Sequence, residues 1–217
     1  QATQLQLLSA QMNPHFIFNA LSSIQHSILH NQMETSLNFI SSFATLMRQV
    51  LENSRKKLIS WNEEQSFLKN YLDIEKFRFE GKFCYQFKVD DDLFLENVYV
   101  PPMLIQPYLE NTVVHGLAQL TERKGEVSIS LFEKNNRMCI QLLDNGVGRE
   151  KALKKRKLRI GEAHVSRAMS ISQQRIELLN TVYNSTAFEV IIDDLYDTNG
   201  NANGTKVSIF FPNEMEE

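Results

Sequence analysis

The segment Asp144–Gly148 combines a carboxylate with two glycines at the end of an expected strand. A carboxylate can accept a hydrogen bond from the amino group of a ligand, and Gly146 and Gly148 leave the backbone beside it free to turn sharply. This pattern is typical of a loop that holds a ligand. Taken alone, an ordinary Asp-Gly turn remains the alternative.

A second polar group lies in the segment Pro107–Gly116. Glu110, Asn111 and His115 fall within about one and a half turns of an expected helix. Glu110 and Asn111 are expected at the edge of its apolar face, beside a cleft. An asparagine oxygen can complete the coordination of Mg²⁺, which prefers oxygen ligands together with phosphates and water. The alternative is a solvated helix face that ends in a glycine cap at Gly116.

A histidine with unusual neighbours lies at position 15, directly after Asn13-Pro14. A neutral imidazole that faces solvent can attack a phosphoryl group, and Pro14 should kink or restart a helix beside it. His26 and His30 are expected on broadly the same side of the helix as His15, but no Asn-Pro pair precedes them. A surface histidine with no role is the alternative.

The segment Asn203–Lys206 is a weaker candidate. Gly204 permits close approach of the backbone to a ligand, and Thr205 offers a hydroxyl group. On its own, the segment is better explained as a hairpin turn.

Helices are expected to position the histidine. Residues 1–33 contain no Asp, Glu, Lys or Arg, and apolar side chains recur every four positions at Met12, Phe16, Ala20, Ile24 and Ile28. A second apolar pattern runs from Leu37 to Leu51 after a short break at residues 30–32, which favours an antiparallel hairpin. Because the apolar stripe needs a partner, we expect two hairpins to form a four-helix bundle in a homodimer.

The rest of the chain predicts an α+β fold. Ser60 and Glu63 have the spacing of a capping box, which opens a helix to about Phe79, and the hydrophobic period changes from 3.6 to 2 at Lys82. A helix is expected over about 103–117 and another over 167–183, and strands near 98–100, 127–131, 138–142, 187–193 and 204–211. This order indicates a layer of helices on a largely antiparallel sheet.

Composition excludes several classes of protein. The formal net charge of the 217 residues is −3, which gives no support for a nucleic-acid partner. Cys84 and Cys139 show no CxxC or Cys/His spacing, so neither a zinc site nor a disulfide framework is indicated. No apolar run approaches the ~18–20 residues that cross a bilayer. The chain begins at Gln1 within a helical pattern, so we expect a fragment of a longer protein.

Four runs in this order resemble the LytS/YehU-type sensor histidine kinases: QMNPHFIFNAL, LIQPYLENTVVHG, DNGVG and NGTKVSIFFP. The resemblance implies a helical dimerisation and phosphoacceptor region at residues 1–58. It also implies an ATP-binding kinase domain at residues 59–217, an α/β sandwich of the GHKL type. It further implies a response regulator as partner and a cytoplasmic location for this portion of an inner-membrane receptor.

The resemblance also assigns roles to residues. His15 would be the phosphoacceptor, Glu110, Asn111 and His115 would form the asparagine box, and Asn111 would hold Mg²⁺. The adenine amino group of ATP would bind Asp144. Gly146 and Gly148 would shape the nucleotide pocket. Gly204 together with Thr205 would form the second glycine box, near the base.

The chain departs from the family pattern at two places. Val114 stands where relatives often have a lysine, and Ser166, Ala168 and Ile171 stand where relatives carry a glycine-rich lid motif followed by an asparagine. The basic run 149–159 could attract a triphosphate in place of the lysine, or could be a solvated loop. Three functions therefore stay open: a histidine kinase, a degenerate nucleotide-binding pseudokinase that signals through helix rearrangement, and an ATPase with Glu110 as base.

Overall fold

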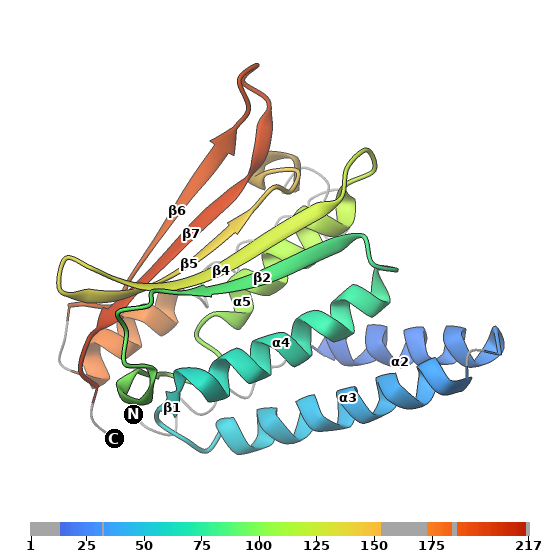
Figure 1. Cartoon of the computed structure of the whole chain (residues 1–217), viewed down its shortest axis with the longest axis horizontal. Coiled ribbons are helices and arrows are strands. Elements are labelled where there is room, and N and C mark those ends of the chain that lie inside the picture. Colours follow the sequence, from blue (N-terminus) through green and yellow to red (C-terminus); the bar gives the residue numbers. More distant parts are fainter. Residues whose placement is uncertain (1–13, 32, 153–172, 184–185, 216–217) are drawn as a thin grey trace. The chain divides into compact units, whose positions relative to one another are not determined.

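The computed structural model describes residues 14–31, 33–152, 173–183 and 186–215, and it has the α+β fold that the sequence predicts (Figure 1). The chain divides into two compact units. The first, the helical unit, comprises the described residues up to Gly81 together with Leu95–Leu104. The second, the sheet unit, comprises Lys82–Phe94 and the described residues from Ile105 onward. The change of hydrophobic period at Lys82 thus marks a crossing between units, whereas the functional division at residues 58 and 59 stays a prediction.

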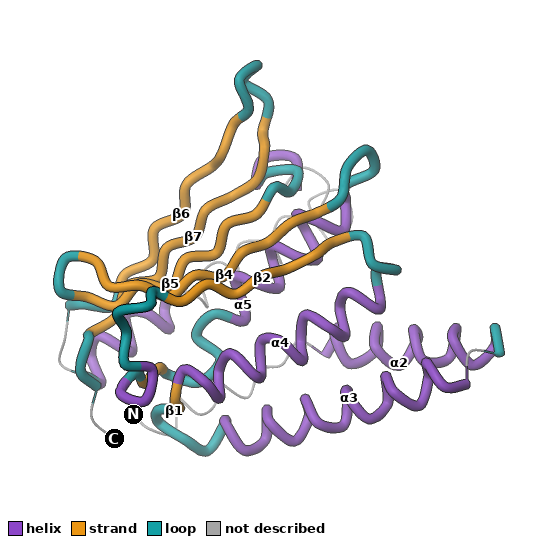
Figure 2. Tube along the Cα trace, in the orientation of Figure 1, coloured by secondary structure: helices purple, strands orange, loops and turns teal. Residues whose placement is uncertain are grey.

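The helical unit begins with the expected hairpin. Helix α2 spans Pro14–Leu29 and helix α3 spans Met33–Asn53, side by side in the tube drawing (Figure 2). Asn31 has a φ of 56°, the left-handed conformation that commonly follows the last turn of a helix. The predicted break at residues 30–32 is therefore confirmed. The residues before Pro14 lie outside the described part, so the choice between a kinked and a restarted helix stays open.

Most of the described part of the predicted apolar stripe of α2 is covered within the protein itself, whereas Ile28 at its end is exposed. Phe16, Ala20 and Ile24 are buried, and the Phe16 ring lies 5.3 Å from the ring of Tyr71 and 6.3 Å from that of Phe43, measured between centroids. The expectation that only a second hairpin could bury this stripe is wrong for these three residues, because α3 and the next helix supply partners. Met12 lies outside the described residues.

A different set of apolar side chains on the hairpin faces solvent. On α2 and α3 these are Phe18, Leu21, Ile28, Leu29, Met33, Leu37, Ile40 and Leu51. Those of α3 are separated by four, three and eleven residues. Because eleven residues make about three helical turns, they form one stripe along the helix. Of the helices within the described residues, none combines the length and the apolar character needed to cross a membrane.

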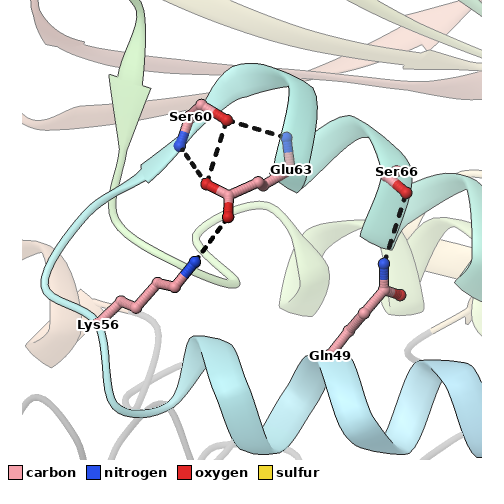
Figure 3. A network of polar contacts seen from close by, with 5 residues as sticks. All are labelled: Gln49, Lys56, Ser60, Glu63 and Ser66. Carbon is pink, nitrogen blue, oxygen red and sulfur yellow. Dashed lines mark hydrogen bonds and ion pairs between the residues drawn. The ribbon is translucent and has the colours of Figure 1, made fainter.

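Helix α4, Trp61–Arg78, completes the helical unit. Its start is the predicted capping box: the Glu63 backbone N–H donates to Ser60 Oγ at 3.2 Å, and the Ser60 N–H donates to the Glu63 carboxylate at 2.9 Å (Figure 3). Lys56 Nζ donates to the same carboxylate at 2.6 Å and lowers the pKa of Glu63. The short strand β1, Ile59–Ser60, pairs antiparallel with β3, Tyr99–Val100, just beyond the single turn η1, Leu95–Asn97.

The sheet unit contains five strands in the order β2-β4-β5-β7-β6. They span Phe83–Val89 (β2), Gly125–Lys134 (β4), Arg137–Asp144 (β5), Glu189–Tyr196 (β6) and Ala202–Pro212 (β7). Only the β2–β4 pair is parallel, so the expectation of a largely antiparallel sheet is confirmed. Asn135 and Asn136 both have positive φ in the turn between β4 and β5, as a two-residue hairpin turn requires.

The prediction of a single regular helix over about 103–117 is wrong, because the helical segment begins later and changes its form along its length. Met103 has a φ of 57°, and the α-helical segment α5 covers only Gln106–Glu110. A π-helical turn follows (η2, Asn111–Gly116), and then a 3₁₀ turn (η3, Leu117–Gln119). The hydrophobic pattern could not reveal the later start or the change to π- and 3₁₀-helix, because apolar residues recur at α-helical spacing throughout the segment.

The capping box gives a first prediction. Replacement of Ser60 by Ala removes the side-chain acceptor for the Glu63 N–H, and we expect a loss of about 1 kcal/mol in the free energy of unfolding, measured with urea. Ser66→Ala is the matched control on the same helix, because exposed Ser66 only accepts a 3.4 Å hydrogen bond from Gln49 (Figure 3). A loss of equal size in both variants would contradict a specific role for the cap.

Candidate functional site

A cavity of about 540 Å³ lies within the sheet unit. Five residues singled out in the sequence line it: Asn111, His115, Asp144, Gly148 and Thr205. Apolar side chains form much of the remaining wall, among them Ile176, Val190, Ile192 and Val207. A mostly apolar cavity with a few converging polar groups is the usual form of a small-molecule site.

Asp144 is the last residue of β5, and its side chain is buried. Its carboxylate accepts hydrogen bonds from the Gly146 N–H at 2.7 Å, from the Thr112 hydroxyl at 3.4 Å and from the Thr205 N–H. Burial raises the pKa of Asp144 to about 6, although these donors act in the opposite direction. At neutral pH the site therefore presents an ionised acceptor within a largely apolar wall.

Two glycines make this arrangement sterically possible. Gly204 has a φ of 105°, and any Cβ atom there would overlap the carbonyl oxygen of Asp144. A Cβ at Gly146 would lie 2.9 Å from the backbone of Gly116, so the loop after β5 and the end of η2 touch backbone to backbone. Gly146 and Gly204 thus allow the backbone to pack closely around Asp144, whereas Gly148 lines the cavity itself.

The π-helical turn η2 presents the predicted asparagine box to the cavity. Its widened turn is visible in the hydrogen bond from the Leu117 N–H to the Thr112 carbonyl, five residues back. Asn111 and His115 line the cavity, and the buried Thr112 reaches Asp144. Glu110 closes α5 and does not line the cavity. π-turns are rare and occur frequently at functional sites.

The Asn145 side chain has a structural role, because it bonds the backbone at the start of β4. Its Oδ1 accepts from the Glu126 N–H at 2.8 Å, and its Nδ2 donates to the Lys124 carbonyl at 3.2 Å. Asn145 therefore ties the start of β4 to the end of β5 and holds the loop after Asp144. The side chain of the DNGVG run that faces the cavity is that of Asp144.

Two further cavity residues, Thr112 and Arg149, were not singled out individually in the sequence. Thr112 has no sequence signal of its own, because its role depends on the contact with Asp144. Arg149 belongs to the basic run, and the structure pairs it with Asp194 on β6 through hydrogen bonds of 2.8 Å from Nε and 2.7 Å from Nη2. This pairing raises the pKa of Arg149 and balances the charge of that one residue. Residues 153–159 of the basic run lie outside the described part.

Several predicted positions fall outside the described part. His15 is the second residue of α2, in the helical unit, and its side chain is not described. Ser166, Ala168 and Ile171, the expected lid positions, lie in the undescribed range 153–172. Within the described residues no three His, Cys, Asp or Glu side chains are grouped so that they could hold a metal ion.

Comparison with known sequences gives the family. A family model described as histidine kinase matches residues 3–83. Sensor protein LytS of Oceanobacillus iheyensis is 36% identical over 146 residues, 67% of this chain and 24% of that protein. Sensor histidine kinase YpdA of Escherichia coli is 36% identical over 145 residues, 67% of this chain and 25% of that protein. The chain belongs to the histidine kinase family. It spans about a quarter of the length of these relatives.

Solved structures resemble the chain more distantly. One described as a bacterial phosphotransferase has a TM-score of 0.49 and 15% identity, over 96% of this chain and 97% of that one. The catalytic domain of histidine kinase ThkA has a TM-score of 0.47 and 14% identity, over 73% of this chain and 97% of that one. The family assignment rests on the sequence matches.

The contact between Gly204 and Asp144 gives a second prediction. Gly204→Ala should destabilise the protein by several kcal/mol, because the new Cβ overlaps the Asp144 carbonyl and β5 and β7 must separate. Gly200→Ala is the matched control: its φ of 77° is also positive, but a Cβ there meets nothing within 4 Å. The control should cost only the ~1–2 kcal/mol of the left-handed backbone. Equal losses in urea unfolding would contradict the steric argument.

The buried carboxylate gives a third prediction. Because folding raises the pKa of Asp144 from 3.8 to about 6, the folded chain binds this proton more tightly than the unfolded chain does. The contribution to stability is present in acid and is lost as the pH rises from about 4 to above 6, by at most about 3 kcal/mol. In Asp144→Asn the contribution is absent. The difference between parent and variant in unfolding free energy should therefore change across this range, and a constant difference would contradict the raised pKa.

Proposed function

We propose that this chain is the kinase portion of a two-component sensor histidine kinase, in which His15 receives the γ-phosphoryl group of ATP and passes it to an aspartate of a response regulator. Membership of the histidine kinase family supports the class of reaction. The observation that carries the nucleotide site is the buried Asp144 carboxylate in a mostly apolar cavity that Asn111 and His115 also line.

The cavity suits the base of ATP. The Asp144 carboxylate can accept a hydrogen bond from the exocyclic amino group of adenine, while Ile176, Val190 and Val207 offer apolar contact to the rings. Thr205 contributes through its backbone N–H, which orients the Asp144 carboxylate. Because Gly146 and Gly204 lack a Cβ atom, the backbone can pack directly against Asp144.

Asn111 is the residue that would hold Mg²⁺. Asn111 lines the cavity, and its amide oxygen is a hard ligand. Mg²⁺ takes few protein ligands and keeps phosphate oxygens and water, which would supply the other positions. Bound Mg²⁺ would supply charge neutralisation on the phosphates.

His15 is the proposed nucleophile. In the transfer a nitrogen of its imidazole forms a bond to the γ-phosphorus as the bond to the β,γ-bridging oxygen breaks, and ADP leaves with that oxygen. Phe16, the next residue, is buried against Phe43 and Tyr71 and so fixes the first turn of α2 to the body of the helical unit. Positioning of this kind supplies much of the catalysis in phosphoryl transfer.

We further propose that the chain acts as a homodimer on the cytoplasmic side of a membrane-tethered receptor, as the family resemblance implies. The exposed apolar residues of the hairpin, including Phe18, Leu21, Leu37 and Ile40, are the surface that a second copy would cover. Two such hairpins would form the four-helix bundle expected from the sequence.

A pseudokinase is the alternative with an observation in its favour. Val114 offers no cation where relatives often have a lysine, and Arg149 is already paired with Asp194. Such a protein would bind nucleotide and signal through helix rearrangement. An ATPase is less well supported, because Glu110, its candidate base, does not line the cavity.

Labelling with γ-³²P-ATP and Mg²⁺ tests the proposal. The parent should gain acid-labile, alkali-stable label, and His15→Gln and Asn111→Ala should each reduce it to background, because one removes the nucleophile and the other the metal ligand. His26→Gln is the matched control on α2 and should keep the label. Nucleotide binding is measured in parallel with a fluorescent ATP analogue, and His15→Gln should bind it like the parent.

Each other outcome assigns a different function. Nucleotide binding without label in the parent would contradict the kinase and favour the pseudokinase. Phosphate release without labelled protein would favour the ATPase. Label that survives His15→Gln would place the phosphoacceptor on another histidine.

A further inference from the structure

Two exposed histidines lie one helical turn apart at the end of α2. His26 belongs to the last turn of the helix, and His30 follows it four residues later, just beyond Leu29. The His30 backbone N–H still donates to the His26 carbonyl at 3.2 Å, so the helical path continues through His30. The ring centroids are 4.1 Å apart with an angle of 41° between the planes. The two imidazoles therefore lie together on one helix face.

The hydrogen bonding of His30 determines which of its nitrogens is available. Its Nδ1 lies 2.8 Å from the His26 carbonyl oxygen. A carbonyl only accepts, so Nδ1 carries the proton and, in the neutral ring, Nε2 keeps its lone pair. A backbone carbonyl on the protonated nitrogen is also the usual support of a metal-bound histidine, because it fixes the tautomer and the ring orientation.

The surroundings favour a cation at this position. The carbonyl end of a helix carries partial negative charge, and apart from His26 the last turn of α2 contains no basic residue. Imidazole nitrogen is a good ligand for Zn²⁺, Cu²⁺ and Ni²⁺, and two histidines at i and i+4 on one helix face are a recognised metal-binding spacing. Since the described residues offer no group of three ligating side chains, water would fill the other coordination positions.

We propose that His26 and His30 form a bidentate site for a divalent transition metal. The bound metal would cross-link the last turn of α2, next to the turn into α3. The site lies outside the cavity of the sheet unit and does not depend on the proposed kinase activity. With only two protein ligands it binds reversibly and responds to the concentration of available metal. A bound metal links residues 26 and 30 and holds the end of α2 in helical form.

Ni²⁺ binding to the tag-free chain tests the site, by calorimetry and by amide hydrogen exchange. The parent should bind one Ni²⁺ per chain at this site, and exchange should slow at residues 26–31 when the metal is present. His26→Ala and His30→Ala should each weaken binding by about tenfold or more, because loss of even a residue that only supports a metal ligand costs roughly that much. His115 and the other side chains that can bind metal are unchanged in all variants, so any binding to them contributes equally to the parent and to each variant.

A pair of double variants separates spacing from histidine content. Ser22→His with His30→Ala rebuilds an i, i+4 pair with His26 one turn earlier, at an exposed position, and should restore binding. Gln25→His with His30→Ala keeps the same number of histidines, but residues 25 and 26 do not face each other, and binding should stay weak. Equal binding by both double variants, or undiminished binding by the single variants, would overturn the proposal.

Discussion

The buried carboxylate of Asp144 determines how the sheet unit is arranged. A carboxylate in an apolar environment is tolerated only if donors surround it, and these donors come from three parts of the chain: Gly146 in the loop after β5, Thr112 in η2 and Thr205 in β7. The three segments must therefore meet at the end of β5. Gly204 permits β7 to come that close, and the space left beside the carboxylate is the cavity.

Sequence patterns predicted the elements that local interactions specify. The capping box at Ser60 and Glu63, the turn at Asn135 and Asn136 and the break after α2 each depend on residues close together in the chain, and all three are confirmed. The candidate residues of the cavity were also found, because Asp144 and Asn111 belong to runs with a family resemblance. Asp144 and Asn111 do line one cavity.

The remaining features depend on contacts between distant segments, which periodicity does not report. The stripe of α2 was expected to need a second chain, but Tyr71 of α4 and Phe43 of α3 already cover Phe16. The π-turn η2 has the apolar spacing of an ordinary helix, so the sequence could not separate the two. Thr112 becomes part of the site only because the fold places it against Asp144.

Within the described residues the chain crosses between the two units three times, at residues 81–82, 94–95 and 104–105. The middle piece, Leu95–Leu104, returns to the helical unit, where β3 pairs with β1 and the Met103 N–H donates to buried Glu64 at 3.2 Å. A fragment cut after Gly81 would keep every helix of the hairpin and α4 yet lose the strand beside β1. Recombination at a single junction therefore cannot exchange one unit of this protein intact, and a chimera has to carry Leu95–Leu104 along with the helices.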